Sequence, residues 1–277
     1  MNALSVNMLK AFKRARNNIY YSQSGEDGLL ELILGKLPNN DGWCTEFGAW
    51  DGKHLSNTYH FITKNNFNSV LIEAEKDRHT QLSHNMKKYK SICINAMVGF
   101  TGGSTLDEIF AKTPIPKDFD LLSIDIDGDD YFVWEALQGY YPKIVIIEIN
   151  IRDKPNVDRI NITGSPMQWG ITGSSIKSMT ELAVRKGYKL IAHIGCNAIY
   201  VRNEYYYLFF DEPVQPTDLF TYEGHRFGEL NKSEMIAANF WLPSWGCFIS
   251  SQLRPRKPVK ALLKKIIYTI RQFVSPN

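Results

Sequence analysis

Acidic residues and glycines are mixed in the stretch EFGAWDGKHLSNT, residues 46–58, which directly follows the strand-like run WCTEF. A glycine-rich turn after a strand usually binds phosphate through its backbone N–H groups. Glu46 and Asp51 would repel a phosphate, whereas they would attract a cation, and the glycines would let such a ligand approach closely. The composition of this turn therefore favours a cationic ligand.

Acids or amides end each of the five strands that we expect to be parallel. These strands are residues 43–47, 69–73, 91–96, 120–125 and 143–149, and the residues at their ends include Glu46, Glu73, Asn95, Asp125 and Glu148. The carboxyl ends of parallel strands meet at one edge of a sheet, where doubly wound folds bind their ligands. The polar residues are therefore predicted to share one site.

The elements that position these residues follow from alternating β-rich and helical patterns, which indicate βαβ units and a parallel sheet. Helices are expected at residues 54–64, 77–89, 104–111, 129–138 and 173–186, the last ended by Gly187. The runs 188–194 and 198–204 are too close in sequence for a crossover helix, so they should form an antiparallel hairpin. The predicted fold class is α/β: a Rossmann-like, doubly wound, mostly parallel seven-stranded sheet with an antiparallel edge hairpin.

The position of Glu73 indicates which class of ligand binds. Glu73 lies about 20 residues after the glycine turn, where a carboxylate can accept hydrogen bonds from both ribose hydroxyls of an adenosine group. Sites for NAD and for S-adenosylmethionine share this feature. A dinucleotide site requires GxGxxG, but this turn reads E-x-G-x-x-x-G. S-adenosylmethionine carries an ammonium and a sulfonium there instead of a phosphate, so the turn favours it. Alternatively, Asp51 and Ser56 could be no more than turn or cap residues.

Several longer motifs resemble the FkbM-type group of class I S-adenosylmethionine-dependent methyltransferases, found in polysaccharide and natural-product gene clusters. The resemblance covers about residues 20–204 and includes YSQSGEDG, EFGAWDGKHLSNT, LIEAEKD, SIDIDGDDYFVWEAL, PKIVIIEIN, GSSIKSMTELAVRKGY and NAIYVRNE. Many relatives read D-x-E-G after the fourth strand, whereas this chain has Asp127 in place of the glutamate. The acid is kept with a shorter side chain.

The resemblance implies a set of cofactor-binding residues. Those implied at the methionine end are Glu46, Gly48 and Asp51, with Ser56 and Asn57 nearby; those at the ribose and adenine are Glu73, Ala74, Ala96 and Met97. Asp125 would close the pocket near the methyl group, and Gln23 and Ser24 would form a lid over the cofactor.

Transfer of a methyl group to a hydroxyl requires a general base or a metal that lowers the pKa of the hydroxyl. Asp127 and His225 are the candidate catalytic residues, although Asp127 could instead cap a helix and His225 could be a surface histidine. Asp125 or Asp127 with Glu148 and Asn150 would suit Mg²⁺, as in catechol-type O-methyltransferases, which these strand ends resemble. This metal site is an alternative that we do not favour.

Composition limits the other partners. The 32 basic residues nearly balance the 29 acidic ones, which gives no footprint for nucleic acid. The four cysteines include no CxxC pair, and neither a signal peptide nor a long apolar run is present. We therefore expect a cytoplasmic protein that binds no nucleic acid.

Four segments are expected along the chain. Residues 1–40 would be a helical lid segment, 41–204 the methyltransferase domain, 205–253 an aromatic-rich substrate cover, and 254–277 a basic amphipathic tail. The tail would lie peripherally on the inner face of an anionic membrane, or dock on its own domain or on a second subunit as a homodimer.

The predicted function is S-adenosylmethionine-dependent O-methylation of a sugar or glycan precursor in the biosynthesis of a surface polysaccharide such as capsule or O-antigen. Two alternatives are a nicotinamide-dependent oxidoreductase and a non-catalytic scaffold in a glycan assembly complex.

Overall fold

The structure is a computed structural model that describes residues 3–126, 128–164 and 172–219. The chain divides into two units, Met1–Leu230 and Asn231–Asn277, of which the second lies outside the described residues. The strands are β1 Trp43–Phe47, β2 Asn68–Glu73, β3 Ser91–Asn95, β4 Leu121–Ile124, β5 Ile144–Glu148, β6 Tyr188–Ile194 and β7 Asn197–Arg202. The helices are α1 Ala3–Ala15, α2 Glu26–Leu34, α3 Tyr59–Lys64, α4 Lys76–Met86, α5 Leu106–Phe110, α6 Asp130–Ala136, α7 Ile176–Arg185, α8 Pro216–Leu219 and the 3₁₀ helix η1 Asn203–Leu208.

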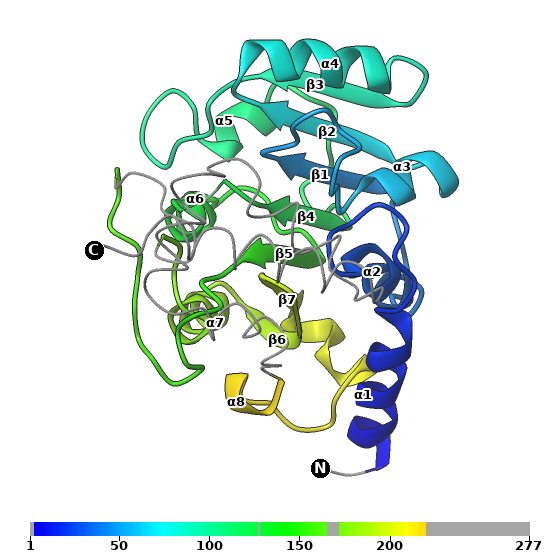
Figure 1. Cartoon of the computed structure of the whole chain (residues 1–277), viewed down its shortest axis with the longest axis vertical. Helices are drawn as coiled ribbons and strands as arrows, with labels where there is room; N and C mark the ends of the chain where they lie inside the picture. The colour runs from blue at the N-terminus through cyan, green and yellow to red at the C-terminus, as the bar shows by residue number, and fades with distance from the viewer. Residues whose placement is uncertain (1–2, 127, 165–171, 220–277) are drawn as a thin grey trace, which may run out of the picture. The chain divides into compact units, whose positions relative to one another are not determined.

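The strands form one sheet in the order β3-β2-β1-β4-β5-β7-β6 (Figure 1). Strands β1 to β5 are parallel, whereas β7 pairs antiparallel with both β5 and β6. The predicted fold class is therefore confirmed. The chain moves outward from β1 to β3 and then returns to β4 on the other side of β1, so the topological switch point lies between β1 and β4.

The central strands are buried on both faces, which explains why their sequences read as continuous apolar runs. Every residue of β4 is buried, as are the first four residues of β5. The observed strands closely match the ranges expected from sequence.

Two of the boundaries that differ from the prediction lie near the carboxyl edge of the sheet. The helix expected at 54–64 begins only at Tyr59, because residues 56–58 are held in a non-helical turn by contacts to β1. The hairpin turn is shorter than expected, since Asn197 already belongs to β7 and pairs with Glu148 of β5. Gly187 follows the last helix with φ 84°, as the C-terminal glycine signal predicts.

A buried ion pair fixes the amino edge of the sheet. The carboxylate of Asp120, just before β4, accepts hydrogen bonds from the backbone N–H groups of Asp41, Gly42 and Trp43 at 2.6–3.2 Å. The ammonium of Lys143 lies 2.8 Å from the same carboxylate. These contacts hold the amino ends of β1, β4 and β5 together, far from their carboxyl ends.

The expected functional segments are only partly covered. Residues 1–40 contain α1 and α2, while of the cover only residues 205–219 are described and the tail at 254–277 lies outside the described residues. The division into these segments stays a prediction. In the part of the chain that the structure describes, no helix is both long and apolar enough to cross a bilayer.

Candidate cofactor site

The carboxyl ends of β1 and β4 pack tightly at the switch point. Gly48 has φ 71°, and a Cβ at this position would lie 2.0 Å from the carbonyl oxygen of Asp125. A side chain is therefore excluded by the neighbouring strand as well as by the backbone conformation. The sequence indicated that Gly48 admits a ligand; the structure shows that it also admits the backbone of β4.

Glu46, Ser56 and Asn57 lie together as predicted, but they form a buried network. The Glu46 carboxylate accepts hydrogen bonds from Ser56 Oγ at 2.6 Å, Thr58 Oγ1 at 2.7 Å and the Asn57 backbone N at 3.0 Å. Burial raises the pKa of Glu46. Asn57 Nδ2 in turn donates to Ser123 Oγ of β4 at 3.1 Å. Glu46 therefore holds the turn before α3 against the sheet.

Asp51 acts as a turn residue, the alternative that its sequence context left open. Its Oδ1 accepts from the backbone N–H groups of Lys53 at 2.9 Å and His54 at 2.8 Å. The following residue, Gly52, has φ 76°, and a Cβ there would lie 2.6 Å from Leu82 Cδ1 of α4. Asp51 and Gly52 thus shape the turn and seat α4 against it.

Glu73 connects the end of β2 to the glycine turn. Its two carboxylate oxygens accept the backbone N–H groups of Trp50 and Glu75, each at 2.8 Å, and the residue is 7% exposed. A carboxylate has about four acceptor positions, so two remain for a ligand. Glu73 is therefore held in a fixed orientation with acceptor capacity left.

Trp50 was not predicted as a site residue. It has φ 49°, is 38% exposed, and carries the guanidinium of Arg78 at 3.6 Å from its ring centroid. The sequence feature that could have identified Trp50 is its position: it is an aromatic residue inside a glycine turn that follows a strand-end acid. Trp50 binds Glu73 through its backbone N–H and keeps a partly exposed ring, one face of which is covered by Arg78.

The residues predicted at the adenine lie beside the ends of β2 and β3. Asn95 pairs with Glu73 in register, and its Nδ2 donates to the carbonyl oxygens of Glu73 at 2.8 Å and Ala74 at 3.0 Å. Ala74 is exposed, Ala96 is half-buried and Met97 is 77% exposed. These side chains offer apolar surface for a flat ring next to the carboxylate.

Several acidic residues follow β4, and the structure describes all of them except Asp127. Asp125 is half-buried at the strand end, whereas the candidate base Asp127 lies outside the described residues. Asp130, which is buried, accepts from the backbone N–H groups of Ile126 and Gly128, each at 2.9 Å. Asp130 therefore holds the backbone of Ile126 and Gly128 close to the start of α6. The other catalytic candidate, His225, also lies outside the described residues, so both roles stay predictions.

Asn150 after β5 is occupied by the loop that follows it. Its Nδ2 donates to the carbonyl of Thr172 and its Oδ1 accepts from the backbone N of Arg152, both at 2.9 Å. This engagement argues against Asn150 as a ligand for Mg²⁺. Within the described ranges, no group of His, Cys, Asp and Glu side chains is placed to hold a metal ion.

The predicted lid residues lie next to the carboxyl edge. Ser22 forms an isolated parallel bridge with Leu55 of the β1–α3 turn, and Gln23 Oε1 accepts a weak hydrogen bond from Cys196 Sγ at 3.8 Å. Ser24, like Gln23, is half-buried. Residues 22–24 therefore connect the glycine turn to the β6–β7 hairpin, as a segment bordering the site would.

Glu26 is a buried acid of this edge to which the sequence assigned no role. It accepts from the Ser24 backbone N at 2.6 Å and from Asn197 Nδ2 at 3.2 Å, and burial raises its pKa. The contact with Asn197, at the start of β7, is a long-range one that the motif alone does not reveal. Glu26 anchors the Gln23–Ser24 segment to the hairpin.

The strand order defines a Rossmann-like α/β fold, and polar side chains line its carboxyl edge at the switch point. No family model matches the chain, and no curated protein matches it.

Among solved structures, the chain is similar to a SAM-dependent methyltransferase from Aquifex aeolicus, at 10% identity and a TM-score of 0.39, over 71% of this chain and 96% of that one. It is similar to the O-methyltransferase from Bacillus cereus in complex with SAH, at 16% identity and a TM-score of 0.41, over 72% and 90% of the two chains. A third is the N-terminal domain of EvdMO1 in the presence of SAH and D-fucose, at 8% identity and a TM-score of 0.42, over 73% and 99%. At these identities and TM-scores, the similarities assign no role to any residue of this chain.

Proposed function

We propose that this protein is an S-adenosylmethionine-dependent methyltransferase. The observation that carries the proposal is the Glu73 carboxylate, fixed by Trp50 N at the end of β2 with acceptor positions left for two ribose hydroxyls. The exposed surfaces of Trp50, Ala74 and Met97 lie on the same edge and suit an adenine ring.

The backbone at the start of α3 argues against a dinucleotide. A pyrophosphate requires free N–H groups at a helix N-terminus. Here the N–H of Asn57 is bound by Glu46, and those of Thr58 and Tyr59 are bound by Ser56 Oγ at 3.2 and 3.0 Å. These donors are occupied, and the carboxylates around them would repel phosphate. A nicotinamide-dependent oxidoreductase is therefore disfavoured.

The acceptor that we propose is a hydroxyl of a sugar or glycan precursor, in the biosynthesis of a surface polysaccharide. S-adenosylmethionine supplies an electrophilic methyl group when bound. The chain must hold the acceptor oxygen in line with that group and remove its proton. We assign proton removal to Asp127, with His225 as the second candidate, because Asp127 follows β4 in the sequence, between two residues whose N–H groups are held by Asp130.

A methyl-transfer assay tests this proposal. The full chain, incubated with radiolabelled S-adenosylmethionine and a panel of neutral, acidic and nucleotide-activated sugars, should label at least one of them. Asp127→Asn should lower turnover at least 100-fold while S-adenosylhomocysteine affinity is unchanged, as expected for loss of a general base. The matched control is Asp118→Asn, an exposed acid at the opposite end of β4, which should leave turnover unchanged.

Full turnover by the Asp127→Asn variant would remove this residue as the base, and activity lost in EDTA and restored by Mg²⁺ would support the metal alternative. Cofactor binding without labelling of any sugar would support a different acceptor class, and absence of cofactor binding would support the scaffold.

A further inference from the structure

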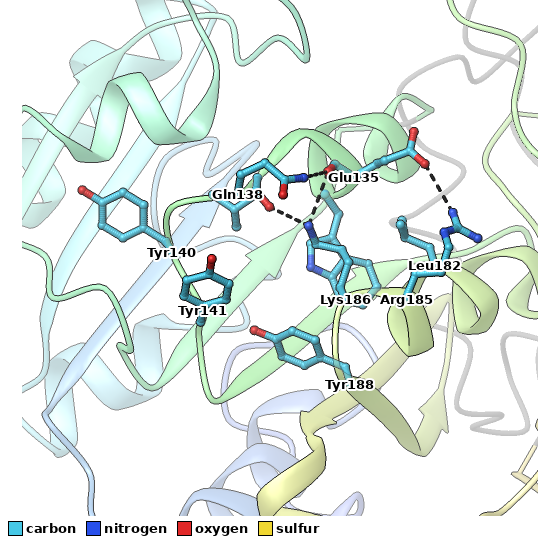
Figure 2. A pocket seen from close by; sticks show the side chains of 10 residues that line it. Glu135, Gln138, Tyr140, Tyr141, Leu182, Arg185, Lys186 and Tyr188 are labelled. Atoms are coloured by element: carbon cyan, nitrogen blue, oxygen red, sulfur yellow. Dashed lines mark hydrogen bonds and ion pairs between the residues drawn. The ribbon is translucent and has the colours of Figure 1, made fainter.

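A cavity lies at the amino edge of the sheet, away from the candidate cofactor site (Figure 2). It has a volume of about 290 Å³ and lies near the lower end of the range for small-molecule sites. The C-terminal ends of α6 and α7, the loop before β5 and the start of β6 form its walls. The residues lining it are Trp134, Glu135, Leu137, Gln138, Tyr140, Tyr141, Leu182, Arg185, Lys186 and Tyr188.

Lys186 places a cation in this cavity without an ion-pair partner among the described residues. Its ammonium donates to the carbonyl oxygens of Leu137 at 2.5 Å and Glu135 at 3.4 Å, at the end of α6. Burial lowers the pKa of Lys186, which shows that its charge is poorly solvated. An ammonium has three donors, so one remains for a ligand.

The carboxylates whose charges act on Lys186 are engaged by other groups. Asp107 accepts the backbone N–H groups of Gln138 at 2.8 Å and Gly139 at 2.7 Å, which also fixes the loop that forms one wall. Glu135 pairs with Arg185 at 3.3 Å. The cavity is therefore preformed, and its cationic group lacks a dedicated counter-ion.

Aromatic side chains border the same space. Figure 2 shows Tyr141 beside Lys186, Tyr188 below it, and Arg185 on the far side, directed toward Glu135. The Tyr140 hydroxyl is directed away from Lys186, and the Tyr140 ring packs edge-on against Phe110 with ring centroids 5.1 Å apart. Tyr141 is 52% exposed and therefore offers a free ring surface next to Lys186.

We propose that this cavity binds a small anionic sugar, a hydroxylated ring that carries a carboxylate or a phosphate, with its anionic group on Lys186 and its ring against Tyr141. The exposed face of Tyr141 suits the apolar face of a sugar ring, while the Gln138 amide oxygen suits a sugar hydroxyl. This site is separate from the carboxyl edge, so the inference does not depend on the proposed methyl transfer.

Calorimetric titration of the full chain with D-glucuronate, D-glucose 1-phosphate and D-glucose tests the inference. At least one of the two anions should bind, and glucose should bind at least tenfold more weakly. Binding of glucuronate alone identifies a carboxylate site, and binding of glucose 1-phosphate alone a phosphate site. Absence of binding by both anions at millimolar concentration, or equal binding of glucose, would overturn the inference.

Variants locate the binding. Lys186→Met should weaken binding of the anion at least tenfold, whereas Lys177→Met, on the same helix but outside the cavity and paired with Asp158 and Glu181, should leave it unchanged. Equal affinity of the Lys186→Met and wild-type proteins would contradict the proposed site. If Lys186→Met does not fold, Arg185→Gln and Tyr141→Ala decide: weaker binding by both supports the site, and unchanged binding by both refutes it.

Discussion

Replacement of Glu73 by glutamine tests the ribose contact while keeping the size of the side chain. The carboxylate of Glu73 holds two backbone N–H groups at 2.8 Å, and a ribose diol would take its remaining acceptor positions. Glutamine keeps one acceptor oxygen and turns the other into a donor, so one charge-assisted hydrogen bond to the ribose is lost and the second becomes neutral. One of the two backbone N–H groups held by Glu73 also loses its acceptor. Hydrogen bonds to charged groups contribute about 1.5–3 kcal/mol each. We therefore expect a loss of about 2–3 kcal/mol in S-adenosylhomocysteine binding.

This loss corresponds to a roughly 30- to 150-fold higher Kd, measured by isothermal titration calorimetry. Glu75→Gln is the matched control, because that exposed carboxylate pairs with Arg78 and should change the Kd less than about threefold. A 2′,3′-dideoxy analogue of S-adenosylhomocysteine should lose much less affinity on the Glu73→Gln change than S-adenosylhomocysteine does. An unchanged Kd for S-adenosylhomocysteine, or an equal loss with the dideoxy analogue, would refute the ribose contact.

Three further predictions concern stability. Gly48→Ala should cost more than about 3 kcal/mol in urea unfolding, because it adds a clash at 2.0 Å to the left-handed backbone, whereas Gly103→Ala, with φ 75° and open space, should cost only about 1 kcal/mol; similar losses would contradict this explanation. Lys143→Met should cost about 3–5 kcal/mol by the same measurement, since it leaves Asp120 buried without its cation; a loss below about 1 kcal/mol would show that the pair is dispensable. Burial lowers the pKa of His193 from 6.5 to about 4, so the unfolded state takes up a proton first and stability should fall as pH drops between these values, by up to about 3 kcal/mol. His193→Gln should flatten that slope in pH-dependent urea titrations, and an identical slope in both proteins would contradict a buried neutral histidine.

The sheet was predictable because its signals are local. Because the central strands are buried on both faces of the sheet, runs such as KIVIIEI are almost continuously apolar. The three residues between 194 and 198 are too few for a crossover helix. The position of Glu73 at the end of β2 also follows from sequence alone. The start of α3 does not, because Glu46 binds Ser56 and Thr58 across the β1–α3 turn, which overrides their local helical pattern.

The positions of the candidate site residues could be predicted from the sequence, whereas their hydrogen-bond partners could not. Acid and amide residues at strand ends were correctly placed on one edge, yet hydrogen bonds to loop backbone occupy Glu46, Asp51 and Asn150. Such bonds depend on which loop residues come near in three dimensions, and a strand-end acid that binds a ligand has the same sequence signature as one that binds a loop. Glu26 was missed for the same reason, since its partner Asn197 is distant in sequence.

We propose that the carboxyl edge binds S-adenosylmethionine and excludes a dinucleotide. Calorimetric titration of the wild-type chain with S-adenosylhomocysteine and, separately, with NAD⁺ tests it most directly. The geometry of Glu73 and the occupied N–H groups before α3 predict binding of S-adenosylhomocysteine and no binding of NAD⁺. Binding of NAD⁺ without S-adenosylhomocysteine, or of neither ligand, would contradict the claim.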